Sequence, residues 1–140
     1  MLLLIALVAI VSASPAEPIL VPPSAPVEEG DVASFALRPG PAGTVFVDGC
    51  AAIELERREA AGWVLAPGAV KCDGSLVARM STKDLVFSVA PPGPGEYRGV
   101  VAWGTGCVEG RPLALAACKA HGIARTAAFT VVARPPAVQR

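Results

Sequence analysis

Four cysteines carry the most definite chemistry in this chain: Cys50, Cys72, Cys107 and Cys118. An even number of cysteines in a short chain forms disulfides in an oxidising compartment. Zinc is the alternative, because Cys118 and His121 have a Cys-x-x-His spacing and thiolates bind zinc tetrahedrally. The other cysteines are isolated from one another, whereas structural zinc sites use closely spaced pairs. We therefore predict two disulfides and no metal.

A predicted hairpin narrows the pairing of these cysteines. Residues 53–56 alternate between apolar and acidic side chains, and residues 63–65 form a second extended run after the turn at residues 59–62. In a hairpin centred between positions 60 and 61, the numbers of cross-strand partners add up to about 121.

This register places the partner of Cys50 at about position 71, next to Cys72. We therefore favour a Cys50–Cys72 bridge, which leaves Cys107 to bond Cys118, eleven positions further along. Each bridge would stabilise the fold by about 3 kcal/mol.

Side chains suited to catalysis are scarce. The chain has one histidine, His121, no asparagine and no glycine-rich phosphate loop, so no Ser-His-Asp or Cys-His-Asn arrangement is indicated. Glu54 and Glu56 share one face of a strand, as a glycosidase carboxylate pair would, but we expect hydration or pairing with Arg57 or Arg58. We predict no catalytic residue, no cofactor and no enzyme.

Composition limits the partners. The chain has 140 residues, twelve basic and twelve acidic side chains and a pI near 6.6. Nucleic-acid binding needs clustered lysine and arginine to neutralise phosphates, and no such cluster is present, so we predict no nucleic-acid partner. Glu28, Glu29 and Asp31 indicate a charged turn rather than a calcium loop, which needs several converging oxygen ligands.

The N-terminal residues predict export. From Met1 to Ala13 every residue except Ser12 is apolar. Such a run is too short to cross a bilayer, which takes roughly 20 residues, but it matches the apolar region of a secretory signal. We predict a signal peptide over residues 1–16, cleaved after Ala13 or Ala16, and a secreted or periplasmic protein with no membrane span. A retained anchor is the alternative, because no Lys or Arg precedes the run.

The rest of the chain divides into three zones. Residues 17–30 are proline-rich and extended, with at most an edge strand at residues 19–21. Residues 31–133 form the globular part, and residues 134–140 form a tail. One helical turn is expected within residues 112–120, where alanine is frequent. Short apolar runs divided by Gly and Pro predict strands at residues 32–37, 44–47, 53–57, 63–65, 85–89, 97–103 and 127–132.

About seven short strands within a hundred residues predict an all-β, two-sheet sandwich, with a disulfide-closed loop before the last strand. Residues 93–98, Gly-Pro-Gly-Glu-Tyr-Arg, resemble the start of the penultimate strand in immunoglobulin-like and fibronectin-type sandwiches, where the tyrosine hydroxyl bonds back to the preceding corner. Residues 127–132 are similar to the closing strand.

The resemblance covers residues 31–132 and implies an immunoglobulin-like domain of secreted or envelope-attached bacterial proteins. Gly99 stands two residues after Tyr97, where true immunoglobulin domains carry a cysteine, so the antibody-type bridge is absent. What the resemblance implies is a binding, adhesion or spacer module without catalytic residues.

We expect an exported, non-enzymatic, monomeric binding or accessory module with a protein or glycan partner. The alternative is an inhibitor of secreted proteases, because a rigid loop lowers the entropy cost of binding. Loops on rigid scaffolds often carry recognition, so we expect the loop over residues 107–122 to be the recognition surface. The alternative is that this loop covers a sheet edge. Trp63 and Trp103 are expected to pack in the core, with partner binding as the alternative. The candidate recognition residues are Glu109, Arg111, Lys119 and His121.

Overall fold

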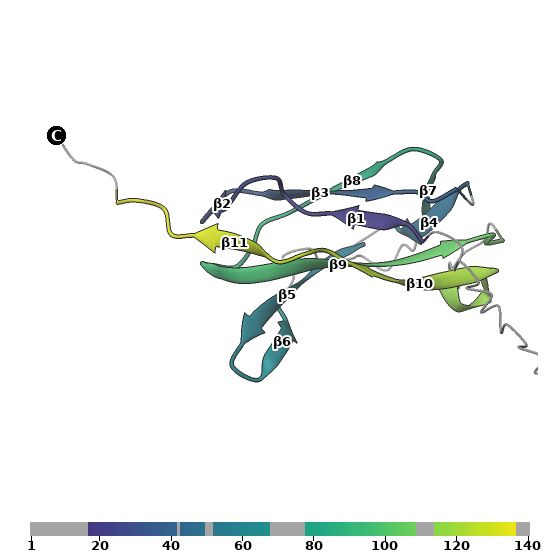
Figure 1. Cartoon of the computed structure of the whole chain (residues 1–140). Coiled ribbons are helices and arrows are strands. Elements are labelled where there is room, and N and C mark those ends of the chain that lie inside the picture. Colours follow the sequence, from purple (N-terminus) through teal and green to yellow (C-terminus); the bar gives the residue numbers. More distant parts are fainter. Residues whose placement is uncertain (1–16, 42, 50–51, 68–77, 109–113, 137–140) are drawn as a thin grey trace, which may run out of the picture.

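The chain forms two β-sheets that lie in separate layers (Figure 1). The computed structural model describes residues 17–41, 43–49, 52–67, 78–108 and 114–136. Sheet A has the strand order β1 (Ile19–Val21), β3 (Ala33–Arg38), β8 (Leu85–Val89). Sheet B has the order β2 (Val27–Glu28), β11 (Phe129–Val132), β9 (Gly95–Thr105), β4 (Val45–Asp48), β7 (Ala78–Ser81). β10 (Ala120–Arg125) and the hairpin of β5 (Ile53–Glu59) and β6 (Gly62–Leu65) complete sheet B, and a 3₁₀ turn, η1 (Leu115–Ala117), precedes β10.

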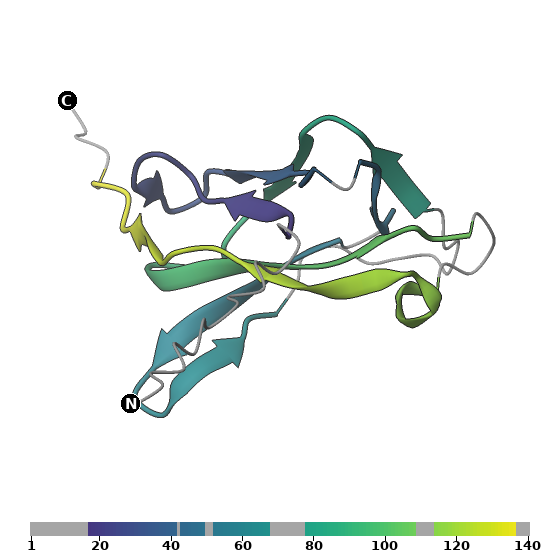
Figure 2. The ribbon, with the colours of Figure 1, turned by 45° about the vertical axis from the view of Figure 1, so that its right-hand side comes forward.

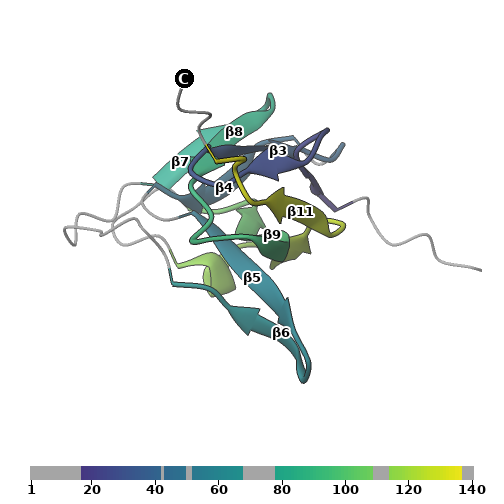
Figure 3. The same cartoon turned by 90° about the vertical axis from the view of Figure 1, so that its left-hand side faces the viewer.

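β9 is the central strand of sheet B, and it is paired along both of its edges. One edge carries β10 and β11 in succession, and the other carries β5 and β4. The β5–β6 hairpin extends away from the two layers (Figure 2). An end-on view shows β3 and β8 on one side of the molecule and β9 and β5 on the other (Figure 3). Because β9 has neighbours on both sides, it positions inward and outward side chains along most of sheet B.

The core is formed by side chains that alternate along the strands. Alternate residues of β3, β8 and β9 are buried, as expected for strands whose side chains point to opposite faces. The buried residues of these strands are Ala33, Phe35, Leu37, Leu85, Phe87, Val89, Tyr97, Val101 and Trp103.

The two sheets approach closely where Phe35 of β3 meets Gly99 of β9. A Cβ atom at Gly99 would lie 2.7 Å from Cε1 of Phe35 and 3.2 Å from Cδ1 of Ile53. The Phe35 ring also packs edge-on against Phe129 with 5.4 Å between ring centroids, and Phe129 stacks on Tyr97 at 6.2 Å. Because glycine has no side chain, position 99 leaves the space between the sheets that the Phe35 ring occupies.

Three hydrogen bonds fix the backbone around this contact. The Tyr97 hydroxyl donates to the Gly93 carbonyl at 2.9 Å, as the resemblance implied for the corner before this strand. The Gly99 amide donates to Oγ1 of buried Thr126 at 2.9 Å, and the Thr126 amide donates back to the Gly99 carbonyl at 3.0 Å. A side-chain oxygen thus takes the acceptor position at the junction between β10 and β11.

Several sequence-based expectations of the strands are confirmed. The hairpin has the expected register, since Glu56 pairs with Leu65 and Glu59 with Gly62. Residues 19–21 form β1 at the edge of sheet A, and η1 lies within the stretch expected to make a helical turn.

Besides the seven expected runs and the edge strand at residues 19–21, three further strands are present, so the described residues contain eleven strands. β2 has only two residues, and it pairs in parallel with β11, far away in the sequence. β7 and β10 lack the run of β-branched and aromatic residues that marks a strand in a sequence. The proline-rich segment consequently supplies an edge strand to each sheet, β1 to sheet A and β2 to sheet B.

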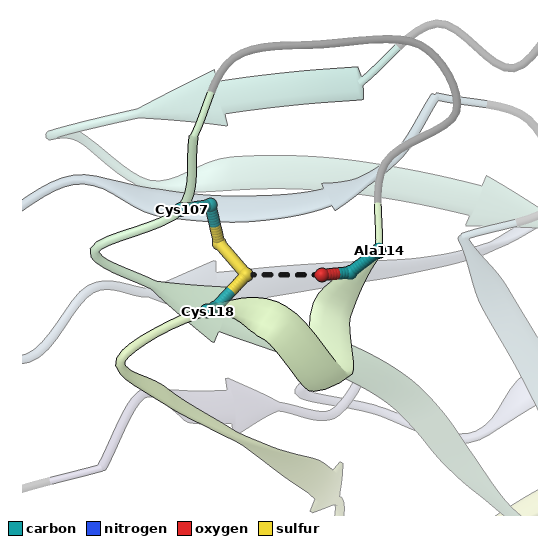
Figure 4. Close-up of a disulfide and its surroundings, with 3 residues drawn as sticks. All are labelled: Cys107, Ala114 and Cys118. Atoms are coloured by element: carbon teal, nitrogen blue, oxygen red, sulfur yellow. Dashed lines mark hydrogen bonds between the residues drawn. A yellow bond between two sulfur atoms is a disulfide. The ribbon is translucent and has the colours of Figure 1, made fainter.

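The disulfide expected between Cys107 and Cys118 is present, with 4.2 Å between the Cα atoms (Figure 4). It lies over Gly104, where a Cβ would come within 2.8 Å of both sulfur atoms. The predicted Cys50–Cys72 bridge and the predicted signal peptide lie outside the described residues. Within the part of the chain that the structure describes, no helix is long and apolar enough to cross a membrane.

The Gly99 contact predicts a local sensitivity to one methyl group. Gly99→Ala should lower the free energy of unfolding by about 1–3 kcal/mol, because the new Cβ overlaps the Phe35 ring. Gly93→Ala is the matched control, since its Cβ would have nothing within 4 Å, and it should change stability by less than about 0.5 kcal/mol. Urea unfolding followed by circular dichroism measures both, and equal midpoints for the two variants would contradict the proposed constraint.

Candidate functional site

Six charged and aromatic side chains gather on the outward face of sheet B, along the β5–β6 hairpin and the strands beside it. We call them the Trp63 cluster. They come from four adjacent strands, β6, β5, β9 and β10, so the sheet itself brings them together. The members are Glu56, Arg58, Trp63, Glu96, Arg98 and Arg125.

Two short sequence repeats produce the ion pairs of the cluster. β5 contains Glu56-Arg57-Arg58 and β9 contains Glu96-Tyr97-Arg98, and each triplet places its first residue, Glu, and its third residue, Arg, on the outward face. In the antiparallel register Glu56 lies opposite Arg98, and Arg58 comes beside Glu96. A Glu-x-Arg triplet is therefore complementary to a second copy of itself on the neighbouring strand.

The inner pair of the cluster is well formed and partly shielded. Nε of Arg98 lies 2.8 Å from Oε1 of Glu56, and the two side chains are only 23% and 19% exposed. Arg125 of β10 shares the same oxygen at 3.4 Å. The outer pair, Arg58 with Glu96 at 3.2 Å, is more exposed. Partial burial strengthens the inner pair, because fewer water molecules screen it.

Trp63 lies across the two arginines. The Arg98 guanidinium carbon is 4.5 Å from the centroid of the indole ring, and the Arg58 carbon is 5.1 Å from it. Both distances fall within the range of favourable cation–π contacts. The expectation that Trp63 packs in the core is wrong: it is only partly buried and sits on the outward face. Trp63 shares this face with Arg58 and Glu56, and the face points away from sheet A, so no opposing sheet buries the indole.

Exposed apolar side chains flank the cluster on both sides. Leu65, opposite Glu56 on β6, is 60% exposed, and Ile123, two residues before Arg125 on β10, is 53% exposed. They share the outward face with the cluster because residues two apart on a strand point the same way. The face therefore combines an ordered polar centre with apolar margins.

Of Glu54 and Glu56, only Glu54 has its predicted role. Glu54 is exposed and forms no ion pair within the described residues, in line with the expected hydrated face. The expectation that Glu56 pairs with Arg57 or Arg58 is wrong. Arg57 points to the other face of β5 and donates to the Pro94 carbonyl at 3.1 Å, while Arg58 is held by the glutamate of β9.

The expected recognition residues fall into two groups. Glu109 and Arg111 lie outside the described residues, so their predicted role stays a prediction. Lys119 is exposed, and its amide donates to the Gly106 carbonyl at 3.3 Å. His121 is exposed but lies on β10 opposite Gly104, not in a loop. The structure does not bring Lys119 or His121 into the Trp63 cluster.

The alternative of a zinc site is contradicted. Sγ of Cys118 is bonded to Cys107, so it is not a thiolate, and the same sulfur contacts the Ala114 carbonyl oxygen at 3.6 Å (Figure 4). Among the described residues no group of three His, Cys, Asp or Glu side chains is placed to hold a metal ion.

Trp103 packs in the core as expected. It is 4% exposed, and its indole lies against Gly122 of β10, where an added Cβ would meet Cζ2 of Trp103 at 3.0 Å. Its Nε1 atom has no hydrogen-bond partner. Trp103 is therefore closed to a large partner, in contrast to Trp63.

The arginines of the Trp63 cluster are the functional candidates that sequence reasoning did not identify. The two Glu-x-Arg triplets indicate these ion pairs, because antiparallel pairing of the two strands places each Glu near an Arg. The register between β5 and β9 was the missing information, since even the pair nearest in sequence, Arg57 with Tyr97, joins residues that are distant along the chain.

Comparisons of this chain with protein-family models, with curated proteins and with solved structures find no match.

The inner ion pair should contribute measurably to stability. A double-mutant cycle with Glu56→Gln and Arg98→Gln should give a coupling energy of about 1–2 kcal/mol, because the pair is hydrogen-bonded and partly buried. The exposed Arg38–Asp84 pair, 3.7 Å apart, is the matched control, and its coupling should be about 0–0.5 kcal/mol. Urea denaturation of the four proteins in each cycle supplies the values. Equal coupling in both cycles would show that the cluster is an ordinary solvated surface.

Proposed function

We propose that this chain is an exported, non-enzymatic binding module of immunoglobulin-like fold that recognises a protein partner through the outward face of sheet B. The Trp63 cluster carries the proposal. Trp and Arg are the residue types that most often dominate binding energy at protein interfaces. Here both types are held in place before any partner arrives.

The prior order of the cluster favours binding. Arg98 is fixed by Glu56 at 2.8 Å and by the Trp63 ring at 4.5 Å, and Arg58 is fixed by Glu96 and the same ring. Ordering a long side chain on binding costs about 0.5–1.5 kcal/mol, and this cost is reduced when the side chain is already ordered. Exposed Leu65 and Ile123 add apolar surface that a partner would remove from water.

Two features support the immunoglobulin-like assignment. The chain passes from β3 in sheet A to β4 and β5 in sheet B, and again from β8 in sheet A to β9 in sheet B, as in a Greek-key sandwich. The Tyr97 hydroxyl bonds back to Gly93 at the start of β9, in the manner of the tyrosine corner of this fold. The aromatic contact of Phe35 with Gly99 lies where the resemblance places an inter-sheet cysteine.

Export is supported by the disulfide and by the N-terminal sequence. The Cys107–Cys118 bridge is typical of oxidising compartments. The apolar residues 2–11 fit a secretory signal, which supports a location outside the cytosol, secreted or in a periplasm.

The proposal is tested by binding with face-specific variants. The oxidised chain, immobilised and exposed to the exported proteins of its source, should retain a partner whose affinity falls at least tenfold in Trp63→Ala and in Arg125→Glu. Tenfold corresponds to about 1.4 kcal/mol, which is typical of an interface hot spot.

The control variants lie on the outward face of sheet A. Ile19→Ala and Val86→Ala, each 61% exposed, should leave the affinity unchanged. Circular dichroism confirms the fold of every variant. Affinity that is equal in all four variants, or a retained species that is a glycan rather than a protein, would contradict the assignment to a protein-binding face.

A second candidate function is inhibition of a secreted protease. The Cys107–Cys118 bond holds the two ends of the intervening loop together, with 4.2 Å between Cα atoms, and a constrained loop loses less entropy in an enzyme cleft. We expect any inhibition to require the disulfide, so Cys107→Ser/Cys118→Ser should raise the inhibition constant at least tenfold. Assays against serine, cysteine, aspartic and metalloproteases at micromolar concentration test this, and no inhibition in any class would exclude it.

A further inference from the structure

At the end of sheet B that is remote from the β5–β6 hairpin, β4 pairs with β7 and β9 ends (Figure 1). A second candidate site lies there. It is an open groove of about 680 Å³, within the size range of small-molecule sites. Its lining comes from β4, from β7 with the turn that follows it, and from the residue after β9. The described lining residues are Thr44, Phe46, Met80, Ser81, Thr82, Lys83 and Gly106.

The floor of the groove is apolar. Phe46 lies between the buried residues Val45 and Val47, so its side chain points to the outward face of sheet B, yet it is only 7% exposed. Met80 is its cross-strand neighbour on β7 and is 51% exposed. Methionine is flexible and polarisable, so it adapts to ligands of different shape. The pair offers a site for an apolar group.

The rim of the groove is polar and carries positive charge. It presents the hydroxyls of Thr44, Ser81 and Thr82 and the ammonium group of Lys83. The Lys83 amide donates to Oγ of Ser81 at 2.9 Å, which fixes the turn that holds the lysine. Lys83 forms no ion pair within the described residues, and the lining given by those residues contains no carboxylate.

Lys119 adds a second positive charge beside the groove. Gly106, one of the lining residues, has a φ of +62° and leaves no space for a side chain, because Cβ, Cγ and Cδ of Lys119 lie 2.9 Å from the position of a Cβ. The Lys119 stem thus packs on the residue that closes this side of the groove. Like Lys83, it has no ion-pair partner in the described part of the chain.

We propose that this groove binds a small organic carboxylate that carries an apolar group, with the apolar group against Phe46 and Met80 and the carboxylate beside Lys83 and the hydroxyls. The Lys83 ammonium group beside the apolar floor favours a ligand in which a negative charge and a hydrocarbon group are adjacent. Such chemistry is found in a free aliphatic or aromatic acid and in the C-terminal residue of a peptide. This site is independent of the Trp63 cluster, so either proposal can fail alone.

The test is a titration of the oxidised, ¹⁵N-labelled chain followed by heteronuclear NMR. N-acetyl-leucine should shift the amide signals of the groove residues and reach saturation. N-acetyl-leucinamide, which has the same apolar group but no charge, should bind at least fivefold more weakly, and acetate should cause no saturable shift. Hexanoate and a tripeptide ending in leucine distinguish the two sources: tighter binding of hexanoate assigns a free acid, and tighter binding of the tripeptide assigns a peptide C-terminus.

Variants connect the binding to the lysine. Lys83→Gln should weaken N-acetyl-leucine at least fivefold and leave N-acetyl-leucinamide unchanged, whereas Lys83→Arg should retain most of the affinity. Arg38→Gln on sheet A is the matched control for loss of an exposed cation and should have no effect. Equal binding of acid and amide, an unaffected Lys83→Gln variant, or shifts confined to residues away from the groove would each overturn the proposal.

Discussion

The contact between Phe35 and Gly99 sets how the two sheets meet. Facing sheets are usually about 10 Å apart, and aromatic side chains fill that space when the opposite strand leaves room for them. At Gly99 the Phe35 ring fills all of this space, because a single additional carbon at Gly99 would overlap the ring. Phe129 and Tyr97 then pack in sequence on that ring. The stability of the sandwich therefore depends on an aromatic row that begins at one glycine.

The same glycine determines how the last strands are divided. β10 pairs Arg125 with Val100, and β11 pairs Phe129 with Tyr97, so four steps along this edge face three steps of β9. One additional residue must be accommodated between them, as in a β-bulge. Thr126 resolves the mismatch, because its hydroxyl accepts the Gly99 amide in place of a backbone carbonyl.

Alternation on β9 couples the core to the candidate binding face. Tyr97 and Gly99 point inward to the aromatic row, while Glu96 and Arg98 between and beside them point outward to the Trp63 cluster. The position of each arginine and glutamate is thus inherited from the packing on the other side of the sheet. A face held by a buried core is stiffer than one carried by a loop, which suits a site whose members are ordered in advance.

Local patterns in the sequence were sufficient for the all-β class, the hairpin register, β8 and the hydrogen bond from Tyr97 back to Gly93, because each depends on residues close together in the chain. The alternation at residues 53–56 and the turn before Trp63 fixed the hairpin without any distant partner. These local patterns do not show which face of β6 is covered, because that depends on the position of sheet A. β2 and the ion pairs of Arg98 were unpredictable for a related reason: both need the register between strands that are distant in sequence.

The position of the Cys107–Cys118 bond has a consequence for how the protein matures. The bond lies just beyond the backbone pair of Thr105 with Ala120, so strands that are already neighbours bring the two sulfur atoms together. Its closure restrains only the short connection between those strands. The pairing of β9 with β10 is therefore expected to precede oxidation and to bring the two thiols together before the bond forms. A time course of thiol trapping during refolding would reveal that order.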